Sequence, residues 1–130
     1  MKYMILVNAS QQDYDDMARW APADFAAMGQ FMEQFSKELT ESGELVDAQG
    51  LAGPDQAKFV VSDGVSAPVV TDGPYPESKE LLAGYRLIDV DSLERALEIA
   101  ARASAAPSVH GAPIRQPIEV RQVMGAPAPE

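Results

Sequence analysis

The densest group of chemically useful side chains lies between residues 71 and 80, in the stretch TDGPYPESKE. A connector between two strands is usually short and does not need this many rigid and charged residues. Asp72 is the leading candidate because Pro74 fixes its own φ and restricts Gly73, so the carboxylate stands on a stiff backbone. A stiff backbone suits a pre-organised site, in which Asp72 would contact a ligand or act as a catalytic base. The alternative is that Asp72 accepts a backbone N–H and caps its own turn.

Three further side chains are candidates for the same site. Tyr75 is either the wall of a pocket or part of the core, and Lys79 is either solvated or holds an anionic ligand. Arg86 is unusual because it falls within a predicted central strand, where a buried arginine needs a carboxylate partner. Asp72 and Asp89 are the candidates for that partner, and Arg86 is also a candidate for ligand contact.

The remaining chemistry-bearing residues form weaker patterns. His110 lies in a predicted loop and is either an exposed side chain or a catalytic residue. The acidic run at residues 13–16 lacks the glycine and the distal glutamate of a calcium loop. The sequence has no cysteine, which excludes thiol catalysis, disulfides and thiolate zinc sites. There is also no glycine-rich phosphate loop and no Gly-x-Ser-x-Gly elbow, so the sequence predicts no metal and no cofactor.

Composition limits the class of protein. The 130 residues carry a formal net charge of −10 and are 46% hydrophobic, enough for one domain with a real core. We expect that domain to span residues 1–124, followed by a disordered tail at residues 125–130. Nucleic acids and anionic membranes would be repelled by the acidic excess. The first apolar run is too short for a signal-peptide core or a membrane span, so we expect a cytoplasmic protein.

Hydrophobic periodicity predicts an α+β domain with the order β-α-β-β-(short β)-β-α-β. This order is the split β-α-β pattern of a ferredoxin-like fold with an added short hairpin strand. The segment at residues 9–20 is polar and is predicted to be a loop. The predicted strands are Lys2–Asn8, Glu44–Leu51, Ala57–Ser62, Pro68–Thr71, Gly84–Val90 and Ile118–Met124.

Two helices complete the predicted fold. The first begins at Pro22 and runs to about Ser42, and Gly43 is a natural stop. Its apolar stripe predicts packing on the sheet, although the same side chains could line a ligand pocket; the stripe comprises Phe25, Met28, Met32, Phe35 and Leu39. The second helix is predicted to follow a capping box in which Asp91 is the cap and Glu94 lies three residues on.

One face of the sheet lacks a cover within a single chain. The two helices cover only one face, yet the first strand is apolar on both sides and residues 59–61 are apolar in sequence. A second copy related by a twofold axis is the simplest cover, so we predict a homodimer in which the sheets face each other. Strand alternation puts Arg86 on the face opposite to Tyr85 and Leu87, and we expect it to point into the cleft between the sheets.

A set of residues along nearly the whole chain matches a known family: residues 1–4, Trp20, Pro22, 43–45, 50–51, 71–75, Glu77, Lys79, Glu80, 84–85, 87–91 and 118–121. By these residues the chain resembles the YCII-related family, and within it the DGPF-domain branch. Tyr75 stands where the motif of that branch has Phe, a change that keeps the ring and adds a hydroxyl. The resemblance implies a dimeric α/β-barrel arrangement. Some relatives outside this branch place a His–Asp pair in the dimer cleft, but His110 lies before the last strand, so the pair is not carried over.

Together, these patterns predict a homodimer that binds a small organic molecule in a cleft between sheet and loop. Asp72, Tyr75 and Arg86 would line this cleft, with Lys79 near them. One alternative is an enzyme of the same fold that performs proton transfer or elimination with Asp72 as base. Another is a structural dimerisation or regulatory module that acts on a protein partner. A closed, polar-lined pocket above roughly 300 Å³ would favour the first two functions, and a dry, filled cleft would leave only the third.

Overall fold

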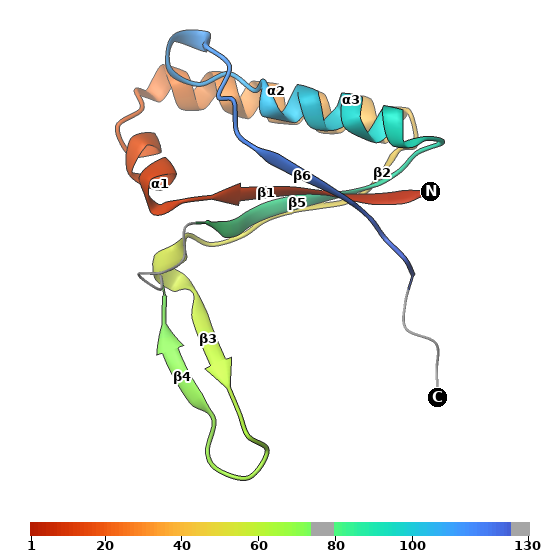
Figure 1. Cartoon of the computed structure of the whole chain (residues 1–130). Coiled ribbons are helices and arrows are strands. Elements are labelled where there is room, and N and C mark those ends of the chain that lie inside the picture. Colours follow the sequence, from red (N-terminus) through yellow and green to blue (C-terminus); the bar gives the residue numbers. More distant parts are fainter. Residues whose placement is uncertain (74–79, 126–130) are drawn as a thin grey trace.

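The computed structural model describes residues 1–73 and 80–125 of the chain (Figure 1). Within them, a four-stranded antiparallel sheet has the order β2-β5-β1-β6, and β3 and β4 form a separate two-stranded sheet. Without the inserted hairpin, the elements follow as β1-α2-β2-β5-α3-β6, which confirms the α+β, ferredoxin-like prediction. The elements are β1 (Lys2–Ala9), α1 (Gln11–Met17), α2 (Pro22–Glu41), β2 (Leu45–Gly50), β3 (Lys58–Val61), β4 (Val69–Asp72), β5 (Leu81–Asp89), α3 (Leu93–Ser104) and β6 (Ile118–Gln122), with short 3₁₀ turns η1 (Pro54–Gln56) and η2 (Val109–Gly111).

Helix α1 replaces the loop that was predicted for residues 9–20, so that prediction is wrong. Its start is a reciprocal capping box: the Asp13 backbone N–H donates to Ser10 Oγ at 3.2 Å, and the Ser10 N–H donates to Asp13 Oδ2 at 2.8 Å. The helix has only seven residues. Tyr14 and Met17 are the only large apolar side chains in it, too few to form a periodic stripe.

The start of α3 also differs from the prediction. Ser92, and not Asp91, is the N-cap, because Ser92 Oγ accepts the Arg95 backbone N–H at 3.1 Å. Asp and Ser are both good N-cap residues. The sequence favoured Asp91 because Glu94, three positions on, completes the pattern of a capping box. The predicted end of α2 is confirmed, since Ser42 is its C-cap and Gly43 follows with a φ of +77°.

The hydrophobic core lies between the sheet and helices α2 and α3. Its largest fully buried side chains are Ile5, Phe35, Leu39, Ile88 and Ile99. The apolar stripe of α2 therefore divides along its length. Its C-terminal half enters the core, whereas Met28 and Met32 are only half-buried and Phe25 remains 46% exposed. Core packing therefore holds for Phe35 and Leu39, whereas Met28 and Met32 line a pocket and Phe25 does neither.

A close backbone approach joins β5 to β2 at Gly84. A Cβ at this position would lie 2.9 Å from the Gln49 carbonyl oxygen and 3.4 Å from Gly50 Cα. We expect Gly84→Ala to lower the free energy of unfolding by about 1–3 kcal/mol, because the strands must separate to admit the methyl group. Gly50→Ala is the matched control, since a Cβ at Gly50 meets nothing within 4 Å. Urea denaturation measures both; an equal, small effect of the two variants would contradict the argument.

Helices α2 and α3 lie on one side of the sheet and leave the other side open (Figure 1). The open face carries Met4 paired with Leu87 and Leu6 paired with Tyr85, with polar neighbours. The Tyr85 hydroxyl donates to Asp47 Oδ2 on this face at 2.8 Å. Among the described residues, no helix has both the length and the apolar character that crossing a bilayer requires.

The β3-β4 hairpin projects from the body on the side of the sheet opposite to the helices (Figure 1). We call residues 58–72 the arm. The turn predicted at Asp63-Gly64 is present: Asp63 Oδ1 accepts the backbone N–H groups of Val65 and Ser66 at 2.9 and 2.8 Å, and Gly64 has a φ of +81°. The arm is therefore a defined hairpin and not an irregular loop.

Candidate functional site

A pocket of about 420 Å³ opens between the helix-covered face of the sheet, helix α1 and the segment 106–118. Its walls are mainly apolar, and include Met17, Trp20, Met28, Met32 and Ile114. Helix α1, which the sequence predicted to be a loop, forms one wall of the pocket. It closes the end of the space between β1 and α2. The predicted cleft between sheet and loop therefore has a counterpart, but on the helix side of the sheet.

Arg86 is the buried one of the charged side chains that line this pocket. Only 9% of the residue is exposed, and burial lowers the pKa of its guanidinium. Its Nη2 lies 3.0 Å from Met32 Sδ, and its Cζ stands 4.8 Å from the centre of the Phe35 ring. Its Nε–H is buried and has no hydrogen-bond acceptor among residues 1–73 and 80–125. A thioether and a ring face are weak partners for a cation, so the guanidinium keeps donor capacity that the described residues do not satisfy.

The expected carboxylate partners of Arg86 are engaged elsewhere. Asp72 forms an ion pair with Lys58 on the arm, and Asp89 pairs with the N-terminal ammonium at 3.1 Å. No carboxylate of residues 1–73 or 80–125 lies within ion-pair distance of Arg86. The expected face is also wrong, since Arg86 lies under α2 and does not point at the open face. Strand alternation predicts which residues of β5 share a face with Arg86. It does not predict which of the two faces of the sheet the helices cover.

Most polar side chains that line the pocket already have partners within the chain. Asp13 belongs to the capping box of α1, and Asp16 accepts from Gln12 at 2.7 Å and lies 3.7 Å from Arg19. Ser108 Oγ donates to the Ala112 carbonyl, and Gln116 donates to the Asn8 carbonyl. The acidic run at residues 13–16 is thus used to build and flank α1. Within the described part of the chain, no group of three or more His, Cys, Asp or Glu is arranged to hold a metal ion.

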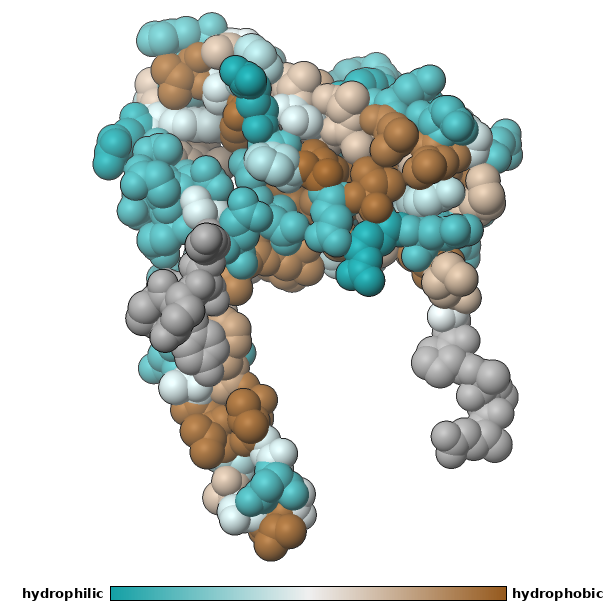
Figure 2. Space-filling view, in the orientation of Figure 1, coloured by the Kyte–Doolittle hydropathy of each residue, from teal (hydrophilic) through white to brown (hydrophobic). Residues whose placement is uncertain are grey.

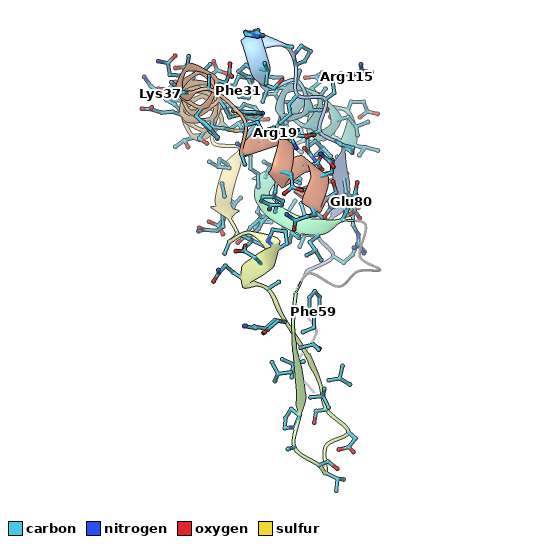
Figure 3. All side chains as sticks on the ribbon, turned by 90° about the vertical axis from the view of Figure 1, so that its left-hand side faces the viewer. Arg19, Phe31, Lys37, Phe59, Glu80 and Arg115 are labelled. Atoms are coloured by element: carbon cyan, nitrogen blue, oxygen red, sulfur yellow. The ribbon has the colours of Figure 1, made fainter. Side chains whose placement is uncertain are left out.

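Arg115 is the second cation of the pocket lining. It is exposed, and its backbone has a φ of +58°, a conformation that non-glycine residues adopt rarely. No ion pair or hydrogen bond joins its guanidinium to the residues that the structure describes. Figure 3 labels it beside the helical layer. Strained backbone of this kind gathers at binding sites, where the surrounding structure holds it in place.

The Asp72-Gly73 pair lies at the base of the arm, outside the pocket. Asp72 is in β4, opposite Lys58 of β3, and its side chain is 77% exposed. Gly73 donates its N–H to the Ala57 carbonyl at 2.8 Å, and a Cβ there would come within 2.9–3.0 Å of Phe59, Ala57 and the Pro54 carbonyl. The glycine is therefore required by packing at the corner where the arm joins the body.

The other predicted site residues are not brought together with Arg86. His110 has a φ of +55° in η2, and its backbone N–H donates to Asp24 Oδ1 at 3.1 Å, which ties this turn to the start of α2. Its side chain is exposed and does not line the pocket. Tyr75 and Lys79 lie outside the described residues. Of the predicted site residues that the structure describes, Arg86 lines the pocket, whereas Asp72 and His110 do not. Met28 and Met32, which the sequence offered as possible pocket lining, also line it, and Arg115, Trp20 and the α1 side chains were missed.

Comparison with known proteins agrees with this fold. The model of the YCII-related domain family matches residues 1–116, most of the chain. The protein therefore belongs to the YCII-related family. An uncharacterized protein from Rhizobium meliloti (strain 1021) is similar to it, with 30% identity over 81 residues that make up 62% of this chain and 64% of the relative. The match thus spans slightly less than two thirds of that relative's length.

Proposed function

We propose that this protein binds a small organic anion in the pocket over Arg86. The observation that carries the proposal is a buried arginine that lines a largely apolar pocket and lacks a carboxylate partner among the described residues. An unpaired buried charge is costly, and such charges are normally paired or hydrogen-bonded. A ligand carboxylate would supply the missing acceptor, and guanidinium donors match its geometry.

The pocket fits a ligand with an anionic end and an apolar body. Its volume of about 420 Å³ lies within the roughly 300–1,000 Å³ of small-molecule sites. Met28, Met32 and Trp20 provide apolar and aromatic walls, and Arg115 is available at the rim for a second polar group. The volume supports ligand binding over a purely structural module, although the lining is mainly apolar and not polar as the sequence-based criterion required. Asp72 lies outside the pocket and has no part in the proposal.

We propose also that the protein acts as a homodimer in which the open sheet faces pack together. The half-exposed apolar side chains of that face support this, and the fold leaves them without a cover from its own helices.

Membership of the DGPF-domain branch remains a proposal that rests on Asp72-Gly73-Pro74, in which Gly73 has a packing role. A cytoplasmic location is likewise a proposal, supported by the absence of cysteine.

Calorimetric titration with matched acids and amides tests the ligand proposal. We expect benzoate and hexanoate to bind at least about tenfold more tightly than benzamide and hexanamide, which is about 1.4 kcal/mol. The apolar parts are the same within each pair, so the difference reports the carboxylate. Equal affinities within both pairs, or no binding of either acid at millimolar concentration, would contradict the proposal.

A further inference from the structure

The arm carries apolar side chains that residues 1–73 and 80–125 of the same chain leave exposed. Five valines are exposed along it: Val60 by 62%, Val61 by 67%, Val65 by 93%, Val69 by 63% and Val70 by 59%. Figure 2 shows these hydrophobic residues gathered on the arm, beyond the body of the molecule. In Figure 3 the arm continues outward past Phe59, which marks its base. Surfaces with this many exposed apolar side chains usually mark interfaces.

Both faces of the hairpin take part. Val60 pairs with Val70 and Val61 pairs with Val69, so one valine pair points to each side of the two-stranded sheet. An isolated two-stranded hairpin is marginally stable in water and needs packing against another element. Within the described residues, β3 and β4 pair only with each other, so the body of the same chain extends no strand to either edge.

We infer that the arm is exchanged between two copies of this chain, each arm packing along the flank of the other copy. The inference rests on the homodimer of the proposed function and adds the element that holds it together. The direction of the arm supports a second copy as the occupant, since the arm leaves the body on the side of the open sheet face (Figure 1). A second copy that covers this face by twofold symmetry lies beside the arm of the first copy. By the same symmetry, the arm of the second copy packs against the first.

The length of the arm fits the same arrangement. At about 3.3 Å per residue, the four residues of β3 span about 10 Å, and the turn that follows them carries the arm further from its base. Two sheets pack about 10 Å apart, so an arm with this strand and turn is long enough to cross the interface and reach the partner's sheet. The open sheet face alone offers little apolar surface for a stable dimer interface, and the arm would add to the buried area. The open face offers Met4, Leu6 and Leu87 among polar side chains, whereas a stable dimer buries about 800 Å² on each partner.

Sedimentation velocity of the full chain tests the exchange. At micromolar concentration we expect the wild-type protein at twice the chain mass of 14.0 kDa and the double variant Val60→Asp, Val70→Asp at the single-chain mass. The double variant should still bind benzoate, because the pocket lies on the other side of the sheet. Leu97→Asp is the matched control, since Leu97 is 49% exposed on α3, and it should leave the dimer intact. A double variant that stays dimeric would overturn the arm exchange but leave the facing-sheet dimer, whereas a monomeric wild type would overturn both.

Hydrogen exchange of the wild-type protein decides the question if the double variant does not fold. We expect the backbone amides of residues 59–61 and 69–71 to exchange at least about tenfold more slowly at micromolar than at nanomolar concentration. A free arm has no reason to respond to concentration. Rates that are fast and equal at both concentrations would overturn the inference.

Discussion

Replacing Arg86 with Met is expected to abolish carboxylate binding while leaving the protein as stable as the wild type or more stable. Methionine fills similar volume beside Met32 and Phe35 and removes a buried charge that the described residues leave without a carboxylate. Such replacements are commonly neutral or stabilising, and we expect a change in the free energy of unfolding between zero and a gain of about 3 kcal/mol. Chemical denaturation and benzoate titration of the same preparation measure the two effects.

Arg102 provides a matched control, because its guanidinium also stacks on the Phe35 ring, 4.6 Å from its centre. Arg102 forms an ion pair with Glu38 and does not line the pocket. Arg102→Met should therefore lower stability and leave benzoate affinity unchanged, the opposite of the Arg86 variant. If both variants destabilise the fold and neither alters binding, Arg86 has a structural role like that of Arg102 and the ligand proposal fails.

Lowering the pH is expected to reduce the free energy of unfolding by protonating Glu44 and weakening its ion pair with Arg95. Arg95 donates to both Glu44 carboxylate oxygens, from Nε and Nη2 at 2.8 Å each, and joins the start of α3 to the loop before β2. These hydrogen bonds lower the Glu44 pKa from its usual 4.5 to about 2. A carboxylate with a lowered pKa stabilises the fold fully above its unfolded value and loses that effect as the pH falls. The contribution should be complete above pH 4.5 and fade as the pH approaches 2.

A variant series at two pH values tests this dependence. Glu44→Gln should cost about 1–2 kcal/mol at pH 7, allowing for the exposed side of Arg95, and progressively less as the pH falls from 4.5 toward 2. Glu94→Gln is the control, because Glu94 is exposed and forms no ion pair among the described residues. Urea denaturation gives the free energies. A Glu44→Gln cost that is the same at pH 3 and pH 7 would show that the ion pair does not stabilise the fold.

The strands and the long helix could be predicted because each carries a characteristic apolar pattern. The short apolar run of β1, which is covered on one face and half-exposed on the other, and the apolar stripe of α2 are patterns that packing enforces. Helix α1 could not be found this way, because its stability comes from the cap at Ser10 and from contact with the body. A signal was present, however: Ser10 followed three residues later by Asp13 is the spacing of a capping box.

The candidate site was harder to predict because it depends on how segments are placed. The sequence singled out Arg86 correctly as an unusual residue for a central strand. It gave no information on which sheet face the helices cover, so the expected direction of Arg86 was wrong. Asp72 and Arg86 stay apart because β3 and β4 leave the main sheet as an arm. Hairpin strands have the same local pattern whether they join a sheet or project from it.

The most direct measurement of the central claim is the NMR signal of the Arg86 Nε–H during a benzoate titration. The Arg86→Met variant assigns this signal by its disappearance. The proposal predicts a saturable shift of the Arg86 resonance, because a carboxylate that binds the guanidinium from the pocket changes the electrostatic environment of this buried N–H. The Arg95 Nε–H, already bonded to Glu44, should not move. An Arg86 signal that is unchanged at saturating benzoate, or that shifts no more than Arg95, would contradict binding at this pocket.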